Sequence, residues 1–431
     1  MRIRILISLL TVIGLAGCTG LTATGAPTDT PQAPVASTAV QTATPMTGEL
    51  QPAIVPLTLW VPEELDPYGS RPGANTLARQ LASFSETYPD LRVEVVVKKA
   101  HGRGGLLDFL RTARDAAPSV LPDLIILDAT DLEAAAGALL VQPLDELLSP
   151  TLQNDRFAFA ARMGQVDEQT MGFVIAADTQ HLAYRQALFS SPVISWTNIV
   201  SSPGPLLFPA GGRERQVNDA TLSQYLSAGG TFVDAEDKLY LNRDVMISVF
   251  TFYSRCVSTG VISPAVVLAM DSADQSWERF KAGEGAMAVA PASRYWTEAD
   301  ETMAVAPLPT ATGQPFALIS QAWAIALVAE DPADQGRATL LLDWLIAPDH
   351  SAQWTRAAGY LPATYGALQL WDVSETDRLM LRSVLDVAAA PSDADVIKTV
   401  GQALQEALEL VLLNRATPRQ AANAAIETLG R

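Results

Sequence analysis

The chain contains few residues whose type and spacing could catalyse a reaction. His101, His181 and His350 lie far apart and have no cysteine at ligand spacing, so the sequence predicts no zinc or redox metal site and no cofactor. The glycine-rich run HGRGG at 101–105 lacks the order that cradles a triphosphate and is interpreted as a loop. Neither a G-x-S-x-G elbow nor an H-E-x-x-H pair occurs. A glycosidase needs two opposed carboxylates, and 47 acidic residues leave that alternative open.

Cys18 stands at the end of a segment that predicts export. Arg2 and Arg4 precede the apolar run 5–13, which is too short to span a bilayer, so residues 1–17 are predicted to be a signal peptide. The letters LAGC at 15–18 resemble the bacterial lipobox, in which the cysteine is acylated and the chain is cut before it. This resemblance implies a lipid anchor on Cys18 and an extracytoplasmic location at the cell membrane, on the periplasmic side or the cell surface. The alternative is an ordinary signal peptide with a chance cysteine.

The residues that follow Cys18 indicate what kind of protein such an anchor would hold. Residues 18–56 are rich in Thr, Ala and Pro with only two charges, so we expect a disordered spacer. The remaining length favours two domains. A net charge of −18 disfavours nucleic acid and anionic lipid as partners. The second cysteine, Cys256, lies among apolar helix positions and is predicted to be buried rather than reactive.

The sequence predicts alternating strands and helices, and these elements must position any ligand-binding or catalytic site. PLTLWVPEE, LRVEVVVKK and PDLIILDA are predicted strands separated by amphipathic helices, a pattern that predicts a mostly parallel α/β sheet. From about Gly172, GFVIAADTQHLAYRQALF predicts a strand that crosses into a second, mainly helical region. Three segments of that region, DATLSQYLSAGG, RDVMISVFTFYSRCVSTG and SADQSWERFKAGEG, close with glycine, as helix C-termini commonly do.

Five segments match motifs of one family in order. LASFSETYPDLRVEVV resembles F-x-x-x-[YH]-P-x-[IV]-x-V, and LPDLIILDATDLEAAAGALLVQPLDELL resembles a P-D strand followed by A-x-x-G-x-L-x-P-L-D. MGFVIAADTQHLAYRQALF and FKAGEGAMAVAPASRYW resemble two crossings between lobes, and AWAIALVAEDPADQGRATLLLDWLIAPDHSAQWTRAAGYLPAT resembles the late stretch ending in G-x-[LIF]-P. Together they resemble the extracellular solute-binding proteins of ABC importers, in the carbohydrate-binding group that includes maltose-binding protein. Departures from the pattern fall around the crossings, at Val174, Arg185 and PASRYW.

The resemblance implies an α/β, two-lobed type II periplasmic binding protein fold with a ligand cleft between lobes joined by hinge crossings. Lobe I would comprise residues 57–176 and 291–318, and lobe II residues 177–290 and 319–431. The implied protein is a monomer that is not an enzyme. It would capture a mono- or oligosaccharide by cleft closure and deliver it to the transmembrane permease subunits of an ABC transporter. A surface-tethered glycoside hydrolase and a sensor lipoprotein without an importer are the alternatives.

Carrying the family's cleft positions over one at a time gives nine candidate ligand contacts. Trp296 and Trp323 are candidates for stacking on a sugar ring, and Arg294 either meets an anionic group or pairs with a surface acid. For every position the alternative is a role in supporting the fold. The candidates are Glu63, Asp66, Tyr68, Asp128, Asp178, Arg294, Trp296, Trp323 and Tyr360.

Overall fold

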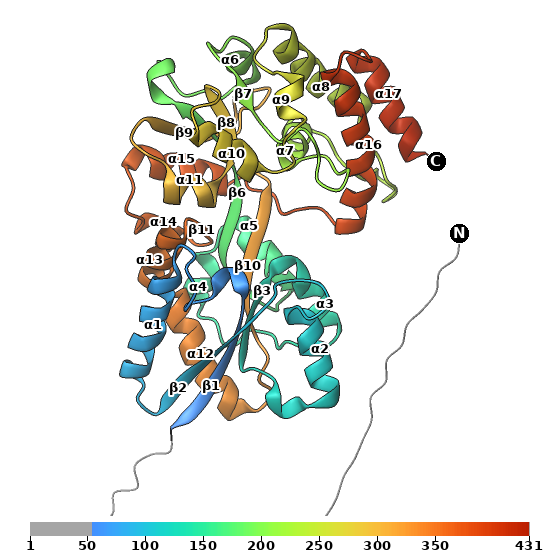
Figure 1. The fold of residues 1–431 in the computed structure, drawn as a ribbon. Helices are drawn as coiled ribbons and strands as arrows, with labels where there is room; N and C mark the ends of the chain where they lie inside the picture. The colour runs from blue at the N-terminus through green and yellow to red at the C-terminus, as the bar shows by residue number, and fades with distance from the viewer. Residues whose placement is uncertain (1–53, 431) are drawn as a thin grey trace, which may run out of the picture. The chain divides into compact units, whose positions relative to one another are not determined.

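Figure 1 shows the computed structural model of the protein, which describes residues 54–430. The predicted signal peptide, Cys18 and nearly all of the predicted spacer lie outside this range. The first strand, β1, begins at Val55, inside the segment predicted as spacer. The strands of the main sheet are β1 (Val55–Pro62), β2 (Leu91–Lys98), β3 (Leu124–Asp128), β6 (Phe173–Arg185), β7 (Leu206–Leu207), β8 (Met287–Pro291), β9 (Met303–Pro307), β10 (Ile319–Leu327) and β11 (Leu361–Pro362).

The strands form a mixed sheet in the order β2-β1-β3-β10-β6-β8-β7, with β9 and β11 also paired to β6. β1 runs parallel to β2 and β3, as the alternation of strands and helices predicted. β10 runs antiparallel to both β3 and β6, and β8, β9 and β11 are antiparallel to β6. β7 and β8 pair in parallel, but every pairing of β6 and β10 is antiparallel, so the prediction of a mostly parallel sheet is wrong: β10 returns from the second half of the chain against the direction of β3.

Helices cover both faces of the first part of the sheet because its strands are apolar on both sides. Leu59 of β1 and Ile126 of β3 share a buried cluster with α1 (Ala74–Thr87) and α12 (Pro332–Ile346). Trp60 and Ile125, one residue away, belong to a second cluster with α2 (Leu106–Ala116) and α3 (Leu132–Gly137). Alternate residues of a strand point to opposite faces, so the run of apolar residues in each strand supplies both clusters.

The late helices divide between the two parts of the sheet. α12 and α13 (Pro348–Ala358) pack with α1, in the cluster that contains β1. The predicted lobe II included residues 319–431, so this packing favours lobe I for the segment 332–358. α16 (Ala394–Leu412) and α17 (Pro418–Leu429) pack instead on α8 (Arg243–Ser258), as Figure 1 shows. The other lobe bounds stay predictions.

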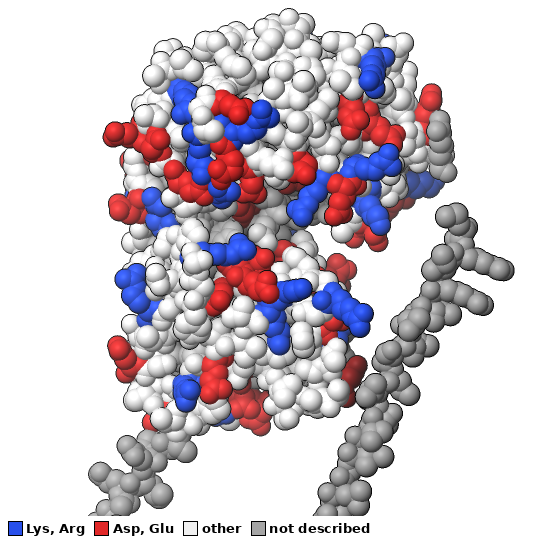
Figure 2. All heavy atoms as spheres, in the orientation of Figure 1, with Lys and Arg blue, Asp and Glu red and all other residues white. Residues whose placement is uncertain are grey.

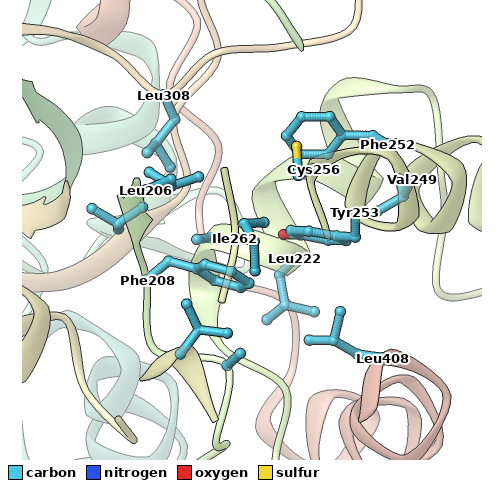
Figure 3. Packing of buried hydrophobic residues seen from close by; sticks show 14 of the residues in the cluster. Leu206, Phe208, Leu222, Val249, Phe252, Tyr253, Cys256, Ile262, Leu308 and Leu408 are labelled. Atoms are coloured by element: carbon cyan, nitrogen blue, oxygen red, sulfur yellow. The ribbon is translucent and has the colours of Figure 1, made fainter. Parts of the chain in front are cut away.

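The second part of the sheet has a hydrophobic core of its own (Figure 3). β8 and β9 pair with the second half of β6, and a large buried cluster containing Phe208, Tyr253 and Leu408 packs there. Cys256 is fully buried in this cluster, as predicted, and burial raises the pKa of its thiol to about 12. Because the first half of β6 pairs with β10, this one strand is shared by both parts of the sheet.

Shorter elements complete the described chain. In residues 54–430 no helix has both the length and the apolar character needed to cross a membrane. The elements not yet introduced are η1 (Glu63–Leu65), η2 (Pro118–Val120), η3 (Ala129–Asp131), α4 (Pro150–Asn154), α5 (Ala158–Met163), β4 (Gln165–Val166), β5 (Gln169–Thr170), η4 (Gln186–Leu188), α6 (Trp196–Val200), α7 (Asp219–Ser227), α9 (Pro264–Val267), α10 (Ala273–Lys281), α11 (Ala292–Glu298), α14 (Tyr365–Gln369) and α15 (Glu375–Leu385).

Candidate functional site

A cavity of about 780 Å³ is lined by residues from both parts of the sheet. Figure 2 shows the surface indented between the upper and lower parts of the described chain, with acidic and basic side chains around the indentation. The first part contributes the loop after β1 and the loop after α13, whereas the second contributes the segments before α7, α10 and α11. The polar and charged residues of the lining are Glu64, Arg71, Asp178, Gln180, Arg213, Glu214, Gln216, Asn218, Asp219, Asp271, Ser272, Asp274, Ser293, Arg294, Ser320, Gln321 and Tyr360.

Asp178 lies in the middle of β6, where the strand passes from one part of the sheet to the other. Its Oδ1 accepts hydrogen bonds from the backbone N–H of Thr179 at 2.9 Å and of Ser293 at 3.1 Å, and its Oδ2 accepts one from the Ser293 hydroxyl. Burial raises the pKa of Asp178 to about 6, even though these hydrogen bonds favour the ionised form. The predicted cleft position therefore lines the cavity and also ties β6 to the start of α11.

Two helices of the second part begin at the cavity. Asn218 caps α7 by accepting a hydrogen bond from the Thr221 N–H, and Ser272 caps α10 through the Gln275 N–H. The first N–H groups of a helix have no partner within it and carry a partial positive charge. At both helices the first turn also contains an acidic residue, Asp219 or Asp274, which offsets this charge. The cavity thus has backbone donors and carboxylate acceptors side by side.

Several buried polar atoms of the lining residues have no hydrogen-bond partner within residues 54–430. They are Glu64 Oε2, Gln180 Oε1, Gln216 Oε1 and Asn218 Nδ2. An unsatisfied buried polar atom costs about 1–3 kcal/mol, so four of them on residues that line one cavity favour a partner that can donate and accept. Hydroxyl groups do both. The lining is therefore suited to a polar, hydroxylated ligand.

Arg294 lines the cavity but is already neutralised by neighbouring acids. Its guanidinium pairs with Asp274 at 2.8 Å, with Glu278, and with both carboxylate oxygens of Glu298. Burial opposes ionisation of Glu298, but hydrogen bonds from Arg294, Lys281 and the Trp277 indole outweigh it and hold the pKa of Glu298 at about 2. Of the two roles considered for Arg294, this geometry favours pairing with surface acids.

The predicted aromatic contacts are placed unequally. Tyr360 lines the cavity, and burial raises the pKa of its hydroxyl to about 12. Trp323 is fully buried in the cluster between β10 and α12, so it contacts core residues rather than the cavity. Trp296 is partly buried against Tyr295 and Trp371, with ring centroids 5.1 Å and 5.8 Å away, and does not line the cavity either. In this conformation neither tryptophan is placed to stack on a ligand.

The loop after β1 contributes different residues from those predicted. Glu63, Asp66 and Tyr68 are absent from the lining, whereas Glu64 and Arg71 are present. The Asp66 carboxylate accepts a hydrogen bond from the Tyr68 N–H, and the Tyr68 side chain is 72% exposed. This loop therefore reaches the cavity through residues other than the predicted ones, because a loop has no periodicity that assigns its faces; ligand contact by Glu63, Asp66 and Tyr68 stays a prediction.

Asp128 ends β3 beside the loop that carries His101 and also lies outside the cavity lining. It accepts hydrogen bonds from the Thr130 N–H and hydroxyl, and its Oδ2 lies 3.6 Å from His101 Nε2. His101 Nδ1 lies 3.3 Å from Asp131. Across the described part of the chain, no group of three or more His, Cys, Asp or Glu side chains is arranged to hold a metal ion.

Sequence reasoning missed the residues at the starts of α7 and α10. Asn218 and Ser272 are N-cap residues, and the pattern of a capping residue before an amphipathic run was visible in the sequence. That pattern locates helix starts, but it does not show which starts converge on one cavity. Gln180 and Gln216 carried no signal at all, because isolated glutamines are common on protein surfaces.

Comparisons with known proteins agree with this architecture. The profile of a family described as bacterial extracellular solute-binding protein matches residues 80–380. No curated protein sequence matches the chain. The cyclic alpha-maltosyl-1,6-maltose binding protein from Arthrobacter globiformis is similar in structure, with a TM-score of 0.66 at 19% identity over 87% of this chain and 98% of that one.

Two further solved structures are similar over the same region. Maltose-bound MalE3 from T. maritima has a TM-score of 0.65 at 18% identity, over 87% of this chain and 99% of that one. An ABC transporter solute-binding protein from Thermotoga lettingae, bound with alpha-D-tagatose, has a TM-score of 0.63 at 17% identity, over 87% and 98%. These likenesses confirm the predicted two-lobed α/β fold.

Proposed function

The chain belongs to the bacterial extracellular solute-binding proteins, and from this membership we propose that it is the carbohydrate-binding subunit of an ABC importer. Family membership implies an extracytoplasmic location. The observation that carries the proposal is the polar cavity, whose lining comes from both parts of the sheet and from β6 and β10 between them. No step of bond chemistry is proposed.

The polar chemistry of the cavity supports a sugar as the ligand. A sugar presents many hydroxyl groups, and each can donate to Gln180 Oε1 or Gln216 Oε1 and accept from Asn218 Nδ2. Such bonds would satisfy the buried atoms that have no partner within the described chain. The similar solved structures include a maltose-bound and a tagatose-bound protein, which supports the same ligand class.

Capture would work by closure of the two lobes about β6 and β10. A ligand that contacts Glu64 and Tyr360 on one side and Gln216 and Asp219 on the other gains both sets of contacts only when the lobes approach. Its differential affinity for the closed arrangement then supplies the free energy of closure. The closed form would dock on permease subunits in the membrane, and opening would release the sugar.

Calorimetric titration with a panel of mono- and oligosaccharides tests the proposal. We expect at least one sugar to bind, and Gln216→Ala to weaken that binding about five- to tenfold, because one buried hydrogen bond is lost. Gln402→Ala, which removes an exposed glutamine outside the cavity, is the matched control and should leave affinity unchanged. Absence of binding across the whole panel would overturn the carbohydrate assignment.

We also propose that Cys18, which lies outside the described residues, anchors the protein through lipid. The support is the lipobox-like LAGC followed by the Thr/Ala/Pro-rich segment, which would give the binding protein reach to open, close and dock. Cys18→Ala should release the protein from the membrane fraction in a cell expressing the full chain. Cys256→Ala, which alters a core position, should stay attached. Full attachment of Cys18→Ala with the signal uncut would contradict the anchor.

A further inference from the structure

The charged side chains that line the cavity differ in burial and in whether they are paired. Six carboxylates line it, and the three guanidiniums belong to Arg71, Arg213 and Arg294. Arg71 and Arg213 are exposed, so solvent screens them, and Arg294 is neutralised by Asp274, Glu278 and Glu298. The charged groups of the lining that are at least partly buried and have no ion-pair partner are therefore acidic, and a buried charge acts more strongly on a ligand than an exposed one. The carboxylates are Glu64, Asp178, Glu214, Asp219, Asp271 and Asp274.

Of the cavity carboxylates that have no hydrogen-bond or ion-pair partner in residues 54–430, Glu64 and Asp219 are the two that are partly buried, and they come from opposite parts of the sheet. Glu64 follows β1 and has a buried Oε2 with no hydrogen-bond partner in the described chain. Asp219 begins α7, is partly buried, and receives neither a hydrogen bond nor an ion pair from any side chain of residues 54–430. Burial raises the pKa of Asp219 above its ordinary value. Both groups therefore lack the donors that buried carboxylates normally have.

Asn218 gives independent evidence that the same place receives a ligand. Its side chain is at the cavity wall, the residue is 9% exposed, and its Nδ2 has no acceptor among the described residues. The Oδ1 of the same amide is used to cap α7. If the ligand has a hydroxyl oxygen next to a hydrogen-bond donor, the oxygen can accept a hydrogen bond from Asn218 Nδ2. The neighbouring donor can then bond to the carboxylate of Asp219.

Stacking is not the main means of recognition in this cavity. Tyr360 is the one aromatic side chain that lines it within residues 54–430, because Trp296 and Trp323 pack elsewhere. The helix N-termini at α7 and α10 would favour an anion, but each first turn already contains its own carboxylate. Hydrogen bonding and charge must therefore supply the selectivity.

Building on the proposed carbohydrate function, we propose that the ligand is a cationic sugar whose protonated amine lies between Glu64 and Asp219, with a neighbouring hydroxyl on Asn218. Neutral sugars bind more weakly, and anionic sugars are rejected. The amine donates up to three charge-assisted hydrogen bonds, which are about twice as strong as neutral ones. Because its acceptors come from both parts of the sheet, the amine also favours closure.

Calorimetric titration of the protein with matched ligands tests this inference. The pairs are glucosamine with glucose, galactosamine with galactose, and mannosamine with mannose, and glucuronate is the anionic probe. We expect the amine to bind about tenfold or more tighter than its neutral partner in at least one pair. Asp219→Asn should remove that preference and leave affinity for the neutral sugar unchanged. Asp244→Asn is the matched control, because Asp244 is an exposed residue in the first turn of α8, a helix that is also capped by an asparagine.

Equal or tighter binding of every neutral sugar, or tightest binding of glucuronate, overturns the cationic ligand and leaves the carbohydrate function intact. If no sugar binds, the non-sugar diamine putrescine separates the two proposals. Putrescine binding that is lost in Asp219→Asn would support a cationic ligand and refute the sugar. Failure of both sugars and putrescine refutes both proposals. Circular dichroism of Asp219→Asn checks that α7 and the fold remain intact.

Discussion

Replacement of Asp178 by asparagine should stabilise the protein at neutral pH. The wild-type carboxylate is buried, and burial raises its pKa to about 6. An asparagine of the same shape keeps the Oδ1 contacts with the Thr179 and Ser293 N–H groups, and its amide can donate to the Ser293 hydroxyl oxygen in place of the wild-type bond to Oδ2. The substitution therefore removes a buried charge, and the loss of the acceptor for the Ser293 hydroxyl proton is a smaller cost that does not change with pH.

The magnitude follows from the difference in pKa between the folded and unfolded states. Below pH 3.8 both states hold the proton, so Asp178 contributes no penalty. As pH rises from 3.8 to about 6, the unfolded state loses its proton first and the free energy of unfolding falls. Above about pH 6 the penalty is complete and amounts to about 3 kcal/mol. The Asp178→Asn variant should lack this penalty. Its free energy of unfolding, relative to that of wild type, should therefore increase by about 3 kcal/mol between pH 3.8 and 7.

Urea denaturation of wild type and variant at several pH values between 4 and 7 measures this difference. The comparison at each pH cancels the titration of all other groups, which both proteins share. Asp244→Asn, an exposed carboxylate outside the cavity, is the control and should track wild type throughout. A difference between Asp178→Asn and wild type that stays constant across this pH range would refute the assignment of a costly buried charge to Asp178.

Three further predictions concern residues near the cavity or in the cores. Trp323→Ala should lower the free energy of unfolding by about 3–5 kcal/mol in denaturant titration, because it empties a fully buried site; a loss of sugar affinity with unchanged stability would contradict this. Arg294→Gln should cost about 1–2 kcal/mol at pH 7, and the deficit should shrink as pH falls from 4.5 toward 2, where Glu298 takes up a proton; a deficit that grows on acidification would contradict the ion-pair account. Cys256 should resist iodoacetamide at pH 8 in the native protein and react after unfolding, as mass spectrometry would show, whereas rapid labelling of the native protein would contradict its burial.

Much of the local structure was predictable because it depends on neighbouring residues. The strands β1, β2 and β3 and the long strand β6 lie where apolar runs predicted them. The three segments predicted to close with glycine do so at Gly229, Gly260 and Gly283, each with a positive φ that other residues adopt at a cost. Burial of Cys256 followed from its apolar helical neighbours. In contrast, the direction of β10 depends on where a distant segment returns to the sheet, so the parallel prediction was wrong there.

The site was predictable only in part. Family resemblance located Asp178, Arg294 and Tyr360, and all three line the cavity. It could not show that Arg294 is neutralised, because Asp274 and Glu278 lie 20 and 16 residues away in the chain and meet it only through the packing of α10 beside α11. Whether these residues contact a ligand stays a prediction.

The sequence by itself determined the family, the positions of most strands and helices, and a chemistry without obvious catalytic machinery, because these depend on residue type and short-range spacing. The tertiary structure alone decided which side chains share the cavity. In the paired strands β10 and β6, Trp323 lies opposite Ala176 and Asp178 lies opposite Gln321, two pairs along the ladder, yet Trp323 enters the core and Asp178 lines the cavity. Pairs that are two apart share one face of the sheet, so the choice depends on the segments that cover that face at each point, the α12 cluster over Trp323 and the start of α11 at Asp178. No local pattern encodes it, because the partners come from segments far apart in the chain.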